Sequence, residues 1–278
     1  MIVVSGIQRT GTSLMMSILS EGGLEIIEDD NDERLKDETF KKLQPNYHEH
    51  TIYKENLTDE NIVELLKLGI KNKCLKIMND ALIRSSSKSF DNIDGIIVMI
   101  RDWKCQEKSW MPLQLDNYRS EFAKRPEIMK RINSVSNMDV FVEDAKWPLG
   151  VRYGFFYSKL IIDIISRQYS SKICFVDFDD MFIDFNYVRF KIQNQFKINI
   201  PKNPISIDKQ ISKNRKTKID QPEFQKGFYD FLDFLYGRMQ KGFIDEELIS
   251  KIKYWMPIMD IEFDKKIQKK YGIRLSNL

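Results

Sequence analysis

The chain has 278 residues, enough to bury the core of a complete α/β domain, and its 42% of hydrophobic residues argues against long disordered stretches. Its 44 lysines and arginines nearly balance 41 aspartates and glutamates, and this net charge of +3 gives no indication of bulk nucleic-acid binding. The cysteines, Cys74, Cys105 and Cys174, are odd in number, which favours buried thiols in a reducing compartment over a disulfide framework.

The first predicted element is a buried strand at residues 2–4, which runs into a glycine-bracketed loop and then a helix. The spacing of Gly6 and Gly11 matches the phosphate-binding template G-x-x-x-x-G-K-[ST], but Thr12 stands where that template has lysine. The cation is Arg9, inside the loop. A loop of this kind can hold an anion with backbone N–H groups and the helix dipole, and an ordinary tight turn is the alternative.

The next elements follow from hydrophobic patterning. A helix from Thr12 to Ser20 ends at Gly22 and Gly23, residues 24–56 show no regular pattern, and a further helix begins at Thr58. The next predicted strand runs from Lys73 to Met78 and includes Lys76.

A second strand-to-helix junction carries another predicted anion contact. The apolar run Ile96–Ile100 is typical of a central parallel strand and ends at Arg101, and a helix follows from Trp103. Ligands of doubly wound sheets bind at the carboxyl ends of strands, so Arg101 is expected where a nucleotide would lie. Ser109 follows eight residues later and can converge on the same anion. The alternative is a surface strand exit without a ligand.

The remaining chain is predicted to be a buried helix over 151–165, a strand from Ile173 that ends in acidic residues, and a helical region from about residue 220. Asp179 and Asp180 are interpreted as a turn and helix cap. Pro257 is expected to stop the last helix. We therefore predict an α/β fold: one three-layer P-loop-type domain over 1–278, with a central, mostly parallel sheet flanked by helices and a helical C-terminal part.

The loop resembles the 5′-phosphosulfate loop of sulfotransferases, which in many carbohydrate and bacterial members reads Pro-Arg-Ser-Gly-Thr-[Ser/Thr]. Arg101 and Ser109 resemble the 3′-phosphate site of that family, and residues 173–181 resemble its Arg-Tyr-Glu-Asp-Leu strand exit. The resemblance implies that 3′-phosphoadenosine 5′-phosphosulfate is the sulfate donor and adenosine 3′,5′-bisphosphate the product. The acceptor would be a hydroxyl or amine of a small molecule, lipid or glycan. The implied nucleotide contacts are Arg9, Thr10, Gly11, Thr12, Ser13, Arg101 and Ser109.

The catalytic base is less clearly marked. Residues 44–50 resemble the Asn-Pro-x-Gly-Tyr-[Tyr/Phe/Trp]-Glu segment of bacterial relatives, which makes Glu49 the implied base; His48 and His50 are alternatives, as is a solvated loop. Lys76 matches a lysine of those relatives and is expected to contact the acceptor or the transferred group. Arg215, in the basic run 212–218, is a candidate for the nucleotide, with a solvated loop as the alternative.

Two other functions stay open at this point. A P-loop kinase of a small metabolite would use Asp102 or Asp177 to hold Mg²⁺, although Thr12 replaces its lysine. A nucleotide-binding relative without activity would have lost the base. No histidine or cysteine spacing predicts a metal site. The first apolar run, which ends before Gln8, is too short for a signal peptide or membrane span, so we expect a cytoplasmic protein.

Overall fold

The computed structural model describes residues 1–27, 72–83, 93–110, 149–207 and 223–271, with only the backbone given for residues 80 and 263–271. Its centre is a five-stranded sheet of order β2-β3-β1-β4-β5, in which every neighbouring pair is parallel. The strands are β1 (Ile2–Gly6), β2 (Glu25–Ile26), β3 (Lys73–Lys76), β4 (Gly95–Ile100) and β5 (Ile173–Asp177).

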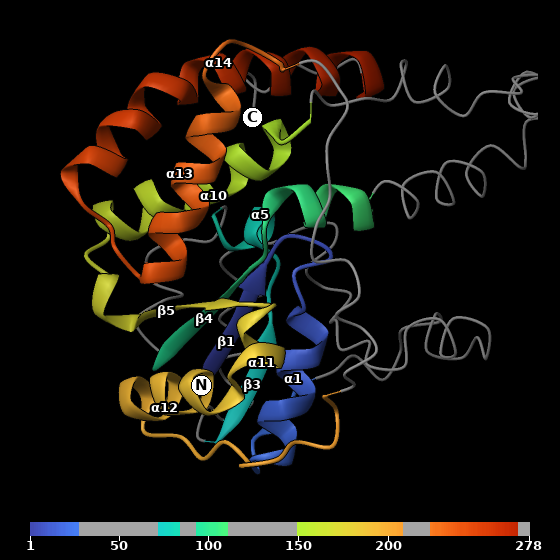
Figure 1. Cartoon of the computed structure of the whole chain (residues 1–278), viewed down its shortest axis with the longest axis vertical. Coiled ribbons are helices and arrows are strands. Elements are labelled where there is room, and N and C mark those ends of the chain that lie inside the picture. Colours follow the sequence, from blue (N-terminus) through green and yellow to red (C-terminus); the bar gives the residue numbers. More distant parts are fainter. Residues whose placement is uncertain (28–71, 84–92, 111–148, 208–222, 272–278) are drawn as a thin grey trace, which may run out of the picture.

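Helices cover both faces of this sheet (Figure 1). On one face lie α5 (Asn79–Leu82), α10 (Val151–Ser166) and α13 (Phe228–Lys241), with α14 (Glu246–Tyr271) packed beyond α10 and α13. On the other face lie α1 (Thr12–Glu21), α11 (Asp180–Ile183) and α12 (Phe185–Phe196). A short 3₁₀ turn, Ser170–Lys172, precedes β5, and residues 103–110 form a further helix after β4. The predicted α/β class is confirmed.

Alternation along the strands explains the two cores. Val3 packs into the core under α10 and α13, whereas Val4 packs into the core under α1 and α12. In β4, Val98 and Met99 divide in the same way. Because both faces are covered by helices, β1, β4 and β5 consist largely of apolar residues, the pattern that identified them in the sequence.

Two predicted boundaries are wrong. Residues 24–56 were expected to be irregular, but Glu25–Ile26 form the edge strand β2, too short for periodicity to reveal; the ion pair between Glu25 and Lys73 (2.9 Å) joins it to β3. Pro257 does not stop the last helix, since α14 continues to Tyr271. A proline removes one helical hydrogen bond, and burial of Met256 and Met259 on either side of it offsets that loss.

The other predicted elements among the described residues are confirmed to within a few residues. The helix predicted from Val151 is α10 and is buried along most of its length. All three cysteines are buried, and none forms a disulfide. The helix predicted from Thr58 lies outside the described residues.

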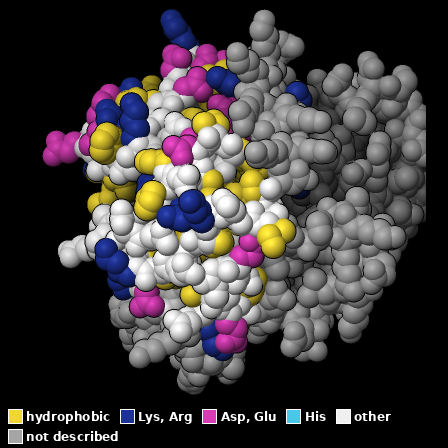
Figure 2. All heavy atoms as spheres, turned by 60° about the horizontal axis from the view of Figure 1, so that its bottom comes forward, with side chains coloured by type: hydrophobic (Ala, Val, Ile, Leu, Met, Phe, Trp, Pro, Cys, Tyr) yellow, Lys and Arg dark blue, Asp and Glu magenta, His cyan; other side chains and the backbone are white. Residues whose placement is uncertain are grey.

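None of the helices in the described parts of the chain is long and apolar enough to cross a membrane. In the view of Figure 2, lysine and arginine side chains are interspersed with aspartate and glutamate over the described surface. This mixture does not favour a nucleic-acid surface on that face.

Candidate anion-binding site

The loop between β1 and α1 has a conformation that its neighbours constrain. Arg9 has a φ of 72°, unusual for a residue with a side chain, and Gly11 has a φ of 89°. A Cβ atom on Gly11 would lie 2.3 Å from the ring of Phe178, which follows β5. Glycine is therefore required at this position both for its φ and for the close approach of β5.

The loop is also stabilised from within. The buried Thr10 hydroxyl donates to the carbonyl oxygen of Ile7 at 2.7 Å, and Thr12 is only 5% exposed. Of the three hydroxyl residues predicted to bind an anion, Ser13 is the most open. The Thr10 hydroxyl thus stabilises the conformation of the loop.

The first turn of α1 has the features of a helix end that binds an anion. Its N-cap is Gly11, no side chain caps it, and the turn holds no acidic residue. Lys76, at the end of β3 and 5% exposed, donates from Nζ to the Ser13 hydroxyl oxygen at 3.0 Å. A lysine beside uncapped amides adds positive charge to the positive end of the helix dipole.

Three of the predicted residues meet on the other side of the loop. Arg9 donates from Nε to the Ser109 hydroxyl oxygen at 3.0 Å, and Arg101 donates from Nη1 to the carbonyl oxygen of Arg9 at 3.3 Å. The Arg101 guanidinium lies 4.5 Å from the centre of the Phe178 ring. Partial burial and the charge of Arg101 lower the pKa of Arg9. Among the described residues neither guanidinium contacts a carboxylate, and the buried Arg101 Nε has no hydrogen-bond partner.

Gln106 joins the loop to the helix of residues 103–110 and was not identified from the sequence. Its Nε2 donates to the carbonyl oxygen of Gln8 at 2.9 Å, one helical turn before Ser109. The spacing of three residues places Gln106 and Ser109 on one helix face, which is the signal that could have found it. The helix is thus attached to the loop by two side chains.

The helix cap predicted at Asp179 and Asp180 is supplied by Asp177 instead. Its Oδ1 accepts from the backbone N–H groups of Asp179 (2.7 Å) and Asp180 (3.3 Å), and its Oδ2 accepts from the Tyr236 hydroxyl at 2.5 Å. Asp179 stands at the N-cap position without a side-chain bond, since the strand end aims Asp177 at these amides. Burial is the main cause that raises the Asp177 pKa to about 6.

A second buried carboxylate, that of Glu107, belongs to the Ser109 helix itself. Glu107 accepts from the backbone N–H of Gly150 at 3.2 Å, at the start of α10, and is 5% exposed. Burial raises its pKa to about 7, although the nearby Arg152 and the Gly150 bond oppose the shift. Glu107 therefore attaches this helix to α10 rather than to a ligand.

The raised pKa of Glu107 predicts that the stability of the folded protein falls as the pH rises from 4.5 to about 7. The folded protein keeps this proton up to about pH 7, whereas the unfolded chain loses it near pH 4.5. Because the folded state binds more protons between these values, the free energy of unfolding should fall by up to about 1.4 kcal/mol per pH unit there. Asp177 contributes with the same sign, but only between pH 3.8 and about 6.

Urea unfolding between pH 6 and 8 measures the Glu107 contribution with little from Asp177. Glu107→Gln keeps an oxygen for the Gly150 N–H and should flatten the curve up to about pH 7. Parallel curves for the variant and the wild-type protein would contradict the buried, protonated state of Glu107.

The structure therefore gathers most of the described candidates around one loop. The described residues hold no group of three or more His, Cys, Asp or Glu side chains arranged to bind a metal ion. Glu49, His48, His50 and Arg215 lie outside the described residues. The candidates that lie at the loop, at its two flanking strand ends or on the Ser109 helix are Arg9, Thr10, Gly11, Thr12, Ser13, Lys76, Arg101 and Ser109.

Comparisons with known proteins add little to this geometry. No family model matches the chain, and no curated protein matches its sequence. Among solved structures, the sulfotransferase domain from the Synechococcus PCC 7002 olefin synthase is similar over 93% of this chain and 93% of that chain, with 13% sequence identity and a TM-score of 0.38. Similarity at this level does not define an activity, so the function is inferred from the site.

Proposed function

We propose that this protein is a sulfotransferase that moves the sulfuryl group of 3′-phosphoadenosine 5′-phosphosulfate to a hydroxyl or amine of an acceptor. The observation that carries the proposal is the meeting of Arg9, Arg101 and Ser109 beside the uncapped N-terminus of α1. Two adjacent guanidiniums that lack a described carboxylate partner favour a ligand with more than one anionic group.

The donor nucleotide fits the residue types at this site. Its 5′-phosphosulfate would lie at the backbone N–H groups of Gly11, Thr12 and Ser13, with Lys76 beside them. Its 3′-phosphate would be held by Arg101 and Ser109. The buried Nε of Arg101 has no hydrogen-bond partner in the described part of the chain, and burial and the charge of Arg101 lower the pKa of Arg9. A bound anion would stabilise the positive charge of both side chains.

The transfer requires little covalent chemistry from the protein. The acceptor oxygen or nitrogen forms a bond to sulfur while the bond from sulfur to the bridging oxygen breaks, and adenosine 3′,5′-bisphosphate leaves. The acceptor proton passes to a base, which we assign to Glu49. Arg9 would stabilise the negative charge that grows on the bridging oxygen, because preorganised donors contribute most where charge develops. Positioning of donor and acceptor supplies the rest.

The kinase alternative is less well supported by the acidic residues. Both oxygens of Asp177 already accept hydrogen bonds from the protein, and Asp102 Oδ1 accepts from the backbone N–H of Cys105 at 3.0 Å. These carboxylates serve as helix caps, which leaves neither of them presented as a simple Mg²⁺ ligand. A nucleotide-binding relative without activity would share the whole site and differ only in turnover.

The choice of nucleotide tests the proposal. Adenosine 3′,5′-bisphosphate should raise the melting temperature by mass action, and ATP with Mg²⁺ should raise it much less. In Arg101→Ala the bisphosphate should bind about 10- to 100-fold more weakly, since a charge-assisted hydrogen bond contributes about 1.5–3 kcal/mol. Ser109→Ala, which removes one hydroxyl, should weaken binding less.

Arg238→Ala is the matched control, because Arg238 pairs with Asp245 (2.8 Å) and Glu247 (2.5 Å), and these ion pairs involve neither the loop nor the Ser109 helix. This variant should bind the bisphosphate as the wild-type protein does. Stronger stabilisation by ATP with Mg²⁺ than by the bisphosphate would favour the kinase. Unchanged affinity in Arg101→Ala would remove this residue from the 3′-phosphate site.

A further inference from the structure

The helix α13 contacts the rest of the protein through two faces, one of which packs into the hydrophobic core. Its core-facing residues include Phe228, Phe231 and Leu235, as the sequence predicts. Tyr229, Asp233 and Tyr236 follow the spacing i, i+4, i+7 and therefore share a different face. Each of these side chains contacts a residue in the segment that follows β4 or at the end of β5.

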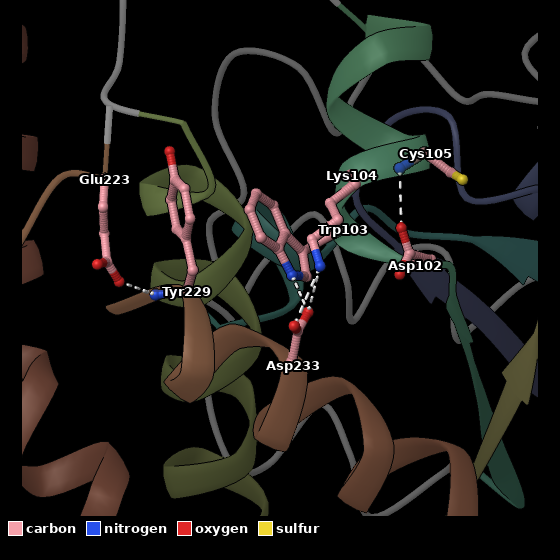
Figure 3. Close-up of polar contacts among 7 residues, drawn as sticks. All are labelled: Asp102, Trp103, Lys104, Cys105, Glu223, Tyr229 and Asp233. Carbon is pink, nitrogen blue, oxygen red and sulfur yellow. Dashed lines mark hydrogen bonds and ion pairs between the residues drawn. The ribbon is translucent and has the colours of Figure 1, made fainter. Parts of the chain in front are cut away.

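The contact of Asp233 is with the first turn of the Ser109 helix (Figure 3). Trp103 donates from Nε1 to Asp233 Oδ1 at 2.6 Å, and Lys104 Nζ lies 3.1 Å and 3.0 Å from the two carboxylate oxygens. Trp103 is fully buried, and its ring centre lies 4.8 Å from that of Tyr229. One carboxylate thus receives hydrogen bonds from two consecutive residues of the helix.

Tyr236 makes the corresponding contact at the end of β5. Its hydroxyl donates to Asp177, the residue directly before Phe178, whose ring lies against Gly11 and Arg101. The same face of α13 therefore contacts both the turn that follows Arg101 and the end of the neighbouring strand β5. Arg101 leaves β4 directly before the turn that Asp233 binds.

We propose that Asp233 is a positioning residue for the 3′-phosphate subsite, and that it sets the preference of the site for a 3′-phosphorylated nucleotide. The inference rests on the proposed function. Ser109 lies about 8 Å along the helix axis from Trp103 and Lys104, given a rise of about 1.5 Å per residue. The helix begins at Trp103, so contacts at its first turn help to set where Ser109 lies.

The anchors in the second turn of the helix do not replace this contact. Gln106 holds the loop, and Glu107 holds the start of α10. Both lie in the second turn, and rotation about them would move the Ser109 hydroxyl relative to Arg101. The proposed 5′-phosphate contacts belong to α1 and β3, whereas the described contacts of Asp233 are with Trp103 and Lys104. Loss of Asp233 should therefore affect one phosphate and spare the other.

The experiment compares two nucleotides that differ only in the 3′-phosphate. Dissociation constants of adenosine 3′,5′-bisphosphate and adenosine 5′-monophosphate are measured by calorimetry for the wild-type protein, Asp233→Ala and Asp233→Asn. Asp233→Ala should weaken binding of the bisphosphate about tenfold, within the usual range of coupling between sites. Binding of the monophosphate should weaken less than about twofold. Asp233→Asn keeps an acceptor for Trp103 and loses the ion pair, so its affinity for the bisphosphate should lie between those of the wild-type protein and Asp233→Ala.

Arg238→Ala again serves as the control, since it removes ion pairs of the same helix away from the nucleotide; its ratio of the two constants should equal that of the wild-type protein. Should Asp233→Ala not fold, Lys104→Met with Asp233→Asn provides the same comparison. A wild-type ratio in all Asp233 and Lys104 variants would overturn the positioning role and leave the sulfotransferase proposal intact. Equal affinity of the wild-type protein for both nucleotides would instead overturn the proposed function, and this inference with it.

Discussion

Arg9→Ala is expected to lower kcat by about 10²–10³-fold, the usual cost of removing a donor that stabilises transition-state charge, while the affinity for adenosine 3′,5′-bisphosphate changes far less. The difference follows from when the charge appears. The bridging oxygen gains most of its charge as the bond to sulfur breaks, so Arg9 contributes mainly to the transition state. In the structure Arg9 Nε donates to the Ser109 hydroxyl oxygen at 3.0 Å, so the Arg9 side chain lies beside one of the proposed nucleotide contacts.

The measurement is a comparison of kcat with nucleotide affinity, with an acceptor that the wild-type protein sulfates. Arg9→Lys keeps a positive charge and loses the planar guanidinium, so part of the activity should remain. If Arg9→Ala and the wild-type protein turn over equally, Arg9 has no part in the chemistry. A loss of affinity as large as the loss of kcat would make Arg9 an ordinary ground-state contact.

The parts of the site that the sequence could predict are those defined by short-range pattern. Gly6 and Gly11 mark the loop because the backbone there has no room for a side chain, and Arg101 marks a strand end because the apolar run before it is continuous. Ser109 could be expected on a helix that starts directly after the strand, and the structure shows that residue 109 lies on such a helix. Each of these features lies within about ten residues of the chain, where backbone geometry alone relates the residues.

The parts that could not be predicted depend on contacts between distant segments. Asp233 and Trp103 are 130 residues apart, and nothing in either segment indicates the other. Asp177 rather than Asp179 caps α11 because the end of β5 aims its side chain back at the following amides, which depends on the turn and not on residue type. Pro257 fits within α14 because tertiary burial outweighs the lost hydrogen bond. Local propensity yields to packing in each case.

The catalytic base gives the other large expected effect. Glu49 follows the aromatic Tyr47 in a segment between the phosphate loop's helix and the next predicted helix, outside the residues that the structure describes. General-base assistance contributes about 10²–10⁴-fold, so Glu49→Gln should lower kcat on that scale. The affinity for adenosine 3′,5′-bisphosphate should stay nearly unchanged, because the base contacts the acceptor and not the nucleotide.

His48→Ala and His50→Ala are the matched controls, since these neighbours are the only histidines of the chain. Each histidine variant should lower kcat much less than Glu49→Gln does if the carboxylate accepts the proton. An inactive histidine variant together with an active Glu49→Gln would assign the base to that histidine. If all three variants stay active while Arg9→Ala is inactive, the site still transfers sulfate and the proton leaves by another group. That pattern separates an error in the base from an error in the reaction, because Arg9 acts on the leaving oxygen whichever group takes the proton.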